Sequence, residues 1–166
     1  RMLTNHHVVN GATNLTVKIK SPDGIERSMS ARVLVSDALR DVALLLVDGD
    51  VAGVEPLVLV NSEAVEPGDK VVAIGNPGIG TRVLMHTTTE GIISGKNRSM
   101  GAKSLFQISA AVNPGNSGGP LFNKYGQVIG MVTMKASLEN VGFAVPSSDL
   151  LQFLKDEGLK FAERQT

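Results

Sequence analysis

The chain has 166 residues, and its 16 lysines and arginines balance its 16 aspartates and glutamates, so the formal net charge is zero. This balance argues against a nucleic-acid-binding module, which normally carries a basic face, and against an acidic disordered tail. The hydrophobic fraction is 42% and the aromatic fraction 4%, so the core must be aliphatic. The absence of cysteine excludes disulfides, thiolate metal sites and cysteine nucleophiles.

No apolar run reaches the roughly 18 residues that a transmembrane helix needs, and no signal peptide is visible. We therefore expect neither a membrane span nor a nucleic-acid partner. The chain begins at Arg1, inside what reads as folded sequence, and we expect it to be a fragment of a longer protein.

The first fifty or so residues predict β-strands. Leu15, Val17 and Ile19 alternate with polar residues, which is the pattern of a half-buried strand. Further strands are predicted at 32–35 and in the apolar run Val42–Val47, whose lack of alternation suits a strand that is buried on both faces.

The second half predicts short strands separated by glycine-rich turns, a pattern typical of β-sandwiches and β-barrels. These strands are expected at 70–75, 82–85, 91–94, 104–108, 127–134 and 141–145. A helix is predicted from 147, where Ser147 or Ser148 can cap it, and Gly158 is a candidate stop before a charged tail that can continue the helix.

The segment from Asn113 to Leu121, NPGNSGGPL, carries the clearest chemical signal. A nucleophilic serine needs an exposed hydroxyl on a tight turn, with backbone N–H groups aimed at the oxygen that becomes charged. The glycines around Ser117 permit such a turn and leave room for a substrate backbone. The alternative is a glycine-rich hairpin connection that contains an incidental serine.

The order of residues along the chain narrows the class of hydrolase. The Gly-x-Ser-x-Gly pattern at 115–119 also matches the nucleophile elbow of α/β-hydrolases, which place histidine after serine, but all three histidines precede Ser117. Asp41, His86 and Ser117 would give the order of subtilisin, whose fold needs several long helices. The order His–Asp–Ser belongs to the double-barrel, chymotrypsin-like proteases, which an all-β chain fits.

Four ordered motifs resemble the HtrA/Deg family of trypsin-like serine proteases, and the resemblance covers nearly the whole chain. They are TNHHVV at 4–9, around the family's catalytic histidine, DVAL at 41–44, GNSGG at 115–119, and GFAVPS at 142–147, at the entry to the C-terminal helix. The resemblance implies an all-β protease domain of two six-stranded-type antiparallel barrels with a C-terminal α-helix. The first barrel is expected to be N-terminally truncated, because so few residues precede the histidine.

On this interpretation the protease domain spans 1–166. It divides into the remainder of the first barrel at 1–50, a connector at 51–69, the second barrel at 70–146 and the helix at 147–163. The resemblance further implies a homo-oligomer, by family a trimer, and many members of the family carry a PDZ domain after the helix. It implies a location in the cell envelope or periplasm or outside the cell, with an organelle as the alternative.

The family pattern selects His7 as the catalytic base, because the histidine directly precedes two aliphatic residues, and it leaves His6 as a surface residue. Asp41 is the predicted acid, since a buried aspartate at a strand entrance needs a partner such as a histidine. Asp37 is expected to cap the adjacent loop together with Arg40. These choices predict a triad of His7, Asp41 and Ser117.

The predicted reaction is serine endopeptidase hydrolysis of unfolded or misfolded polypeptides, a protein quality-control activity, through an acyl-enzyme. The backbone N–H groups of Gly115 and Ser117 would form the oxyanion hole, and the mechanism needs no metal or organic cofactor. A catalytically silent, protease-like binding domain is the first alternative. An unrelated all-β interaction module is the second.

Substrate preference is predicted from the stretch 109–112, which contains no acid. A charged substrate side chain would be desolvated there without a counter-ion, so small or aliphatic residues before the scissile bond fit better. The residues expected to contact that side chain are Val112, Met131, Thr133 and Phe143. Their alternative role is core packing.

Overall fold

The computed structural model describes residues 1–51, 53–79, 82–135 and 141–159. The chain divides into two compact units, Arg1–Leu57 and Val58–Thr166, so the boundary falls inside the predicted connector 51–69. Most of the connector has no regular structure. Its one isolated bridge among the described residues joins Leu59 to Val128 within the second unit.

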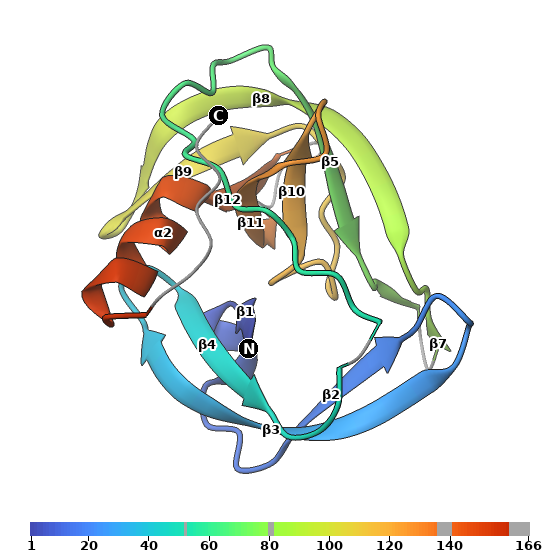
Figure 1. Cartoon of the computed structure of the whole chain (residues 1–166). Helices are drawn as coiled ribbons and strands as arrows, with labels where there is room; N and C mark the ends of the chain where they lie inside the picture. The colour runs from blue at the N-terminus through green and yellow to red at the C-terminus, as the bar shows by residue number, and fades with distance from the viewer. Residues whose placement is uncertain (52, 80–81, 136–140, 160–166) are drawn as a thin grey trace. The chain divides into compact units, whose positions relative to one another are not determined.

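The first unit is a four-stranded antiparallel sheet of order β1-β4-β3-β2 (Figure 1). Its elements are β1 (Met2–Thr4), α1 (His6–Val9), β2 (Leu15–Lys20), β3 (Glu26–Asp37) and β4 (Val42–Val47). Strand β2 alternates half-buried and exposed residues, and β4 is buried over its first four positions, as the two apolar patterns predict. A small core of Val9, Ala43 and Leu45, with Leu15 against it, holds α1 on the sheet.

The second unit is a closed six-stranded antiparallel barrel of order β10-β11-β12-β9-β8-β5 (Figure 1). Its strands are β5 (Lys70–Gly75), β8 (Thr87–Met100), β9 (Lys103–Ile108), β10 (Pro120–Asn123), β11 (Val128–Lys135) and β12 (Gly142–Pro146). A two-stranded ribbon of β6 (Gly78–Ile79) and β7 (Arg82–Val83) lies between β5 and β8 in the sequence.

The aliphatic core predicted from the composition lies inside this barrel. Ile93, Ile108, Leu121 and Val132 are fully buried there, and one aromatic residue, Phe106, belongs to the same cluster. The open first sheet, the closed second barrel and the C-terminal helix confirm the predicted fold class.

The C-terminal helix α2 spans Ser147–Asp156. The predicted extension of the helix is therefore wrong for residues 157–159, and residues 160–163 lie outside the described part. Gly158 has a φ of +64°, and its N–H donates to the carbonyl of Lys155, which ends the helix as the stop signal predicts. The predicted serine caps are also wrong. The hydroxyls of Ser147 and Ser148 instead bond the segment 60–62, which ties α2 to the connector.

Several strands differ from those predicted. Strand β7 ends at Val83 rather than at residue 85, and the strand expected at 91–94 is the middle of the longer β8. Strand β10, between Pro120 and Asn123, was not predicted, because a sequence dominated by the serine motif hides a strand of four residues. A register shift between Leu121 and Phe122 further breaks the alternation there.

Candidate active site

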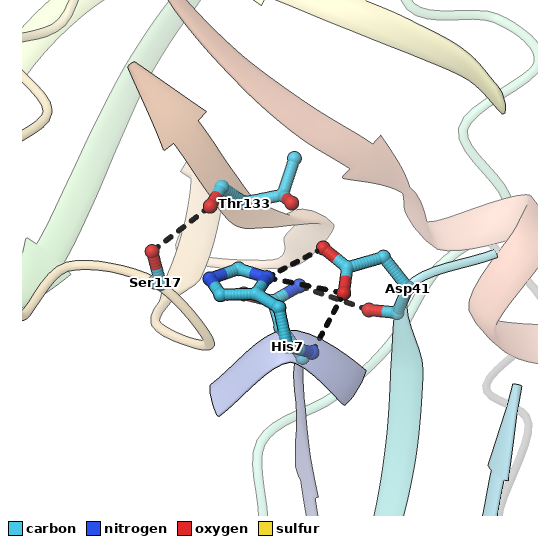
Figure 2. Close-up of polar contacts among 5 residues, drawn as sticks. His7, Asp41, Ser117 and Thr133 are labelled. Atoms are coloured by element: carbon cyan, nitrogen blue, oxygen red, sulfur yellow. Dashed lines mark hydrogen bonds and ion pairs between the residues drawn. The ribbon is translucent and has the colours of Figure 1, made fainter. Parts of the chain in front are cut away.

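His7 and Asp41 meet within the first unit. The Asp41 carboxylate lies 2.8 Å from His7 Nδ1 through Oδ2 and 3.1 Å through Oδ1, and Oδ1 also accepts the backbone N–H of His7 at 3.0 Å (Figure 2). The Asp41 side chain is 2% exposed, whereas the His7 side chain is 48% exposed. A buried carboxylate therefore fixes one ring nitrogen of a half-exposed imidazole, which favours the tautomer with the proton on Nδ1.

Asp41 occupies an uncommon backbone conformation, with a φ of +59°. Aspartate visits this left-handed region more readily than most residues, but the conformation still costs roughly 1–2 kcal/mol. It stands directly before β4, where the chain leaves the turn after Asp37. The turn therefore delivers the carboxylate to α1, while β4 itself stays buried.

The competing residues have the other roles that were predicted for them. Asp37 Oδ1 accepts the N–H groups of Leu39 and Arg40, and its Oδ2 lies 3.1 Å from the Arg40 guanidinium, so Asp37 caps the turn. His6 is partly exposed, and its Nδ1 lies 3.1 Å from the hydroxyl of Ser36. Among the described residues, the hydrogen bonds of the His7 ring go to Asp41 and not to either of these two.

His86 lies apart from the His7–Asp41 pair in sequence and in role. It is exposed, it belongs to the second unit, and its backbone N–H donates to Asn76 Oδ1 at 2.8 Å. The subtilisin-like assignment of His86 as the base for Asp41 therefore has no support, because Asp41 pairs with His7.

Ser117 lies in the second unit, in the loop between β9 and β10. Its loop is anchored on both sides by backbone bonds: Gly118 N–H donates to the carbonyl of Val132, and Val132 N–H donates to the carbonyl of Gly119. Gly115 has a φ of +100°, and a Cβ at this position would overlap the carbonyl of Asn76. Only glycine fits this close approach, which explains the glycine before the serine.

The backbone N–H groups of this loop alternate between paired and unpaired. Those of Asn116, Gly118 and Gly119 donate to backbone carbonyls. Those of Gly115 and Ser117 have no acceptor among the residues that the structure describes. Two such donors on one tight turn can bind a negatively charged oxygen.

The hydroxyl of Ser117 donates to the backbone carbonyl of Thr133 at 2.9 Å (Figure 2). Thr133 lies on β11, so the hydroxyl is held against the barrel strand that anchors its loop. The sequence analysis missed this role of position 133, because a main-chain carbonyl leaves no signature in a sequence.

The four residues predicted to contact the substrate are all buried in the second unit: Val112, Met131, Thr133 and Phe143 are between 0% and 7% exposed. Val112 belongs to the barrel core and packs near Gly142, where a Cβ would meet its side chain. No acidic residue stands among them, and residues 136–140, which follow β11, lie outside the described part.

Asn5 is a further residue of the site that was not predicted from the sequence. Its side chain is 0% exposed, and its Nδ2 donates to the backbone carbonyl of Asp41 at 3.0 Å. The signal that could have found it is an asparagine directly before a helix that carries a candidate base, since asparagine is a preferred helix N-cap.

Two further findings concern the described residues as a whole. They include no group of three or more histidine, aspartate or glutamate side chains that could hold a metal ion. None of their helices has both the length and the apolar character needed to cross a membrane.

Comparison with known proteins defines the class. The family model of the trypsin-like peptidase domain matches residues 1–131, and the chain belongs to this family. Within the family its likeness is to HtrA-type serine proteases, as the resemblance predicted.

The relatives show how far the likeness extends. The chain is 40% identical to the serine protease Do-like HtrB of Bacillus subtilis, over 90% of this chain and 33% of that protein. It is 38% identical to a probable periplasmic serine endoprotease, DegP-like, of Hahella chejuensis, over 95% of this chain and 34% of that protein. The chain thus spans about a third of the length of these relatives.

A solved structure agrees with the sequence comparison. The HtrA-type protease AlgW, solved with a decapeptide, matches 95% of this chain and 49% of its own, with 35% identity and a TM-score of 0.77.

Proposed function

We propose that this chain is the catalytic domain of a serine endopeptidase in which His7, Asp41 and Ser117 form the triad. The observation that carries the proposal is the buried Asp41 carboxylate, 2.8 Å from Nδ1 of the half-exposed His7. The pair leaves Nε2 of His7 as the ring nitrogen that can accept a proton. An exposed imidazole fixed in this tautomer is what a general base needs.

The reaction follows from these roles. Nε2 of His7 takes the proton from Ser117 as Oγ attacks a peptide carbonyl, and the N–H groups of Gly115 and Ser117 bind the oxygen that becomes negative. His7 then gives the proton to the leaving amine, which breaks the peptide bond and leaves an ester on Ser117. Water hydrolyses this ester by the same proton transfers, while Asp41 stabilises the protonated imidazole.

The serine must first exchange its hydrogen-bond partner. Its hydroxyl donates to the Thr133 carbonyl, and a rotation about one side-chain bond frees it for the base. The resting bond keeps the hydroxyl ordered on its loop but withholds the proton from His7.

The proposed substrates are unfolded or misfolded polypeptides with a small or aliphatic residue before the scissile bond. This preference is supported by the acid-free stretch 109–112. The names of the DegP-like relatives supply the proposed location in the cell envelope or periplasm, and family resemblance supplies the proposed trimer.

Hydrolysis of casein by the chain, compared with its Ser117→Ala variant, tests the activity. Mapping the cleavage sites by mass spectrometry tests the preference, and we expect most cuts after valine, alanine or isoleucine. A majority of cuts after lysine or arginine would contradict the preference alone. Equal hydrolysis by the chain and by its Ser117→Ala variant would contradict the proposed activity.

A second candidate function is a protease-like binding domain without activity. The bond from the Ser117 hydroxyl to the Thr133 carbonyl favours it, because a serine that stays in this rotamer cannot pass its proton to a base. This candidate predicts that Ser117→Ala leaves polypeptide binding unchanged and that no substrate is cleaved.

A further inference from the structure

We propose that Asn5 is a positioning residue for the His7–Asp41 pair, which it serves by holding the backbone of Asp41. The inference rests on the proposed function and adds to it a residue outside the triad. Its basis is a pair of hydrogen bonds between the start of α1 and the turn before β4. At Asn5 and Asp41 these two segments are 36 residues apart in the sequence.

The first of these bonds comes from the Asn5 amide. Asn5 is 0% exposed, and its Nδ2 donates to the carbonyl of Asp41 at 3.0 Å. A carbonyl can only accept, so this contact fixes which end of the Asn5 amide faces Asp41. The opposite end, Oδ1, is buried and has no hydrogen-bond partner among the described residues.

The second bond lies at the cap of α1. Asn5 is the N-cap residue of this helix, a place where an asparagine side chain ordinarily accepts a backbone N–H of the first turn. Its side chain makes no such bond here. The N–H of His7, which an N-cap side chain could satisfy, donates instead to Asp41 Oδ1 at 3.0 Å.

Asn5 and Asp41 thus each satisfy a backbone group of the other's segment. The Asp41 carboxylate satisfies the first turn of the helix that carries His7, and the Asn5 amide satisfies the carbonyl of Asp41. With Oδ1 of Asp41 held by the main chain, its Oδ2 faces the imidazole at 2.8 Å. One bond to the carboxylate, from the His7 N–H, and one to the main chain of Asp41, from Asn5, therefore contribute to its orientation without involving the ring.

The backbone of Asp41 shows why this support is needed. Its φ of +59° is a sparsely populated conformation for a residue with a side chain, and such conformations persist when the surroundings over-determine them. The Asn5 bond to the Asp41 carbonyl is a direct restraint on the peptide that follows. Without it we expect that peptide to rotate and to turn the carboxylate away from Nδ1.

A purely structural role for Asn5 is the competing explanation. It leaves the unpaired Oδ1 unexplained, because an apolar side chain of similar size would fill the same buried place without an unsatisfied oxygen. An amide at this position, with its bond to the Asp41 carbonyl, points to the positioning role.

The test uses Asn5→Ser and Asn5→Ala, with Asn10→Ala as the control. Serine is a preferred N-cap residue, so Asn5→Ser keeps the helix start and retains the fold, but its shorter side chain cannot reach the Asp41 carbonyl. Asn10 is the same residue type at the other end of α1, where it is exposed.

The first readout is the NMR signal of the His7 ring in the 166-residue chain carrying Ser117→Ala, which prevents self-digestion. With Asn5 present we expect a hydrogen-bonded Nδ1–H resonance and ring nitrogen shifts of one tautomer. Both Asn5 variants should lose that resonance and show a mixture of tautomers, and Asn10→Ala should keep it. Far-UV circular dichroism confirms that each variant is folded.

The second readout is kinetic, in the chain with Ser117 intact. Misplacing a catalytic group by about 1 Å costs on the order of 10²-fold, so we expect kcat to fall by about that factor in both Asn5 variants while KM is unchanged. A folded Asn5→Ser variant that keeps the Nδ1–H resonance, or loss of the resonance in Asn10→Ala as well, overturns the inference. If the chain with Asn5 cleaves nothing, the proposed function fails, and the NMR comparison still decides the role of Asn5.

Discussion

The two halves of the proposed triad are held in different ways. His7 and Asp41 depend on side-chain contacts between α1 and a turn of an open four-stranded sheet. Ser117 depends on backbone bonds to a strand of a closed six-stranded barrel. The difference is also one of burial, since among the described residues fewer apolar side chains are buried in the first unit than in the second.

The comparison indicates which kind of substitution should disrupt each half of the site. The serine loop should tolerate side-chain changes and fail when a glycine is lost, because glycine geometry and main-chain bonds shape it. The base half should tolerate loop changes and fail when one buried polar side chain is lost, because side-chain contacts position His7 and Asp41.

The largest effect is expected at the triad itself. His7→Ala and Ser117→Ala should each lower kcat for casein or a cleaved peptide by at least about 10⁴-fold, and Asp41→Asn by about 10⁴-fold, because the wrong imidazole tautomer is favoured. Steady-state kinetics on a peptide substrate measures this. Substantial activity in His7→Ala together with an inactive His6→Ala would show that the base is misassigned by one residue.

The serine loop is next, at Gly115. Its φ of +100° and the nearby Asn76 carbonyl leave no place for a Cβ, so Gly115→Ala should displace an oxyanion donor and lower kcat by about 10²–10³-fold. The control is Gly101→Ala, which has a positive φ of +65° but no atom within 4 Å of the added Cβ. Equal activity of the two variants would contradict the role of the close approach between Gly115 and the Asn76 carbonyl.

The cores of the two units should differ in stability. Leu121 is 0% exposed in the barrel core, and Leu45 is 4% exposed in the small core of the first unit. Truncation of a buried leucine costs about 2–5 kcal/mol, with the higher values where the surroundings cannot collapse. Urea unfolding should therefore show a larger loss for Leu121→Ala than for Leu45→Ala, and the reverse order would contradict the contrast between the units.

The smallest effect is expected at His6. Its ring contacts the Ser36 hydroxyl in an exposed bond, and the ring that faces Asp41 is that of His7. His6→Ala should keep kcat/KM within about threefold of the starting value, a change of less than 1 kcal/mol. The same peptide assay measures it, and Ser36→Ala is the matched variant, which should be equally mild.

The fold could be predicted where one apolar pattern dominates a segment. The alternation at 15–19 and the continuous run of β4 both gave the correct strands. Short elements were lost, because three residues of β1, four of α1 and four of β10 carry too little periodicity to stand out. The capping serines of α2 were misjudged because bonds to distant residues 60–62 compete for the same hydroxyls.

The residues of the candidate site likewise differ in whether the sequence could predict them. His7, Asp41 and Ser117 could be proposed from sequence because their residue types and order carry the chemistry. Asn5 and the carbonyl of Thr133 could not, because one acts through a distant backbone and the other through an atom that every residue has. Contacts between side chain and main chain that span 36 residues become visible only in a structure.

Labelling by a fluorophosphonate tests the central claim most directly, because this probe reacts with a serine only when a base and an oxyanion hole activate it. We expect mass spectrometry of the labelled chain to place the adduct on Ser117, with labelling abolished in His7→Ala and strongly slowed in Asp41→Asn. Labelling that is absent from the unsubstituted chain, or that persists unchanged in His7→Ala, would contradict the account.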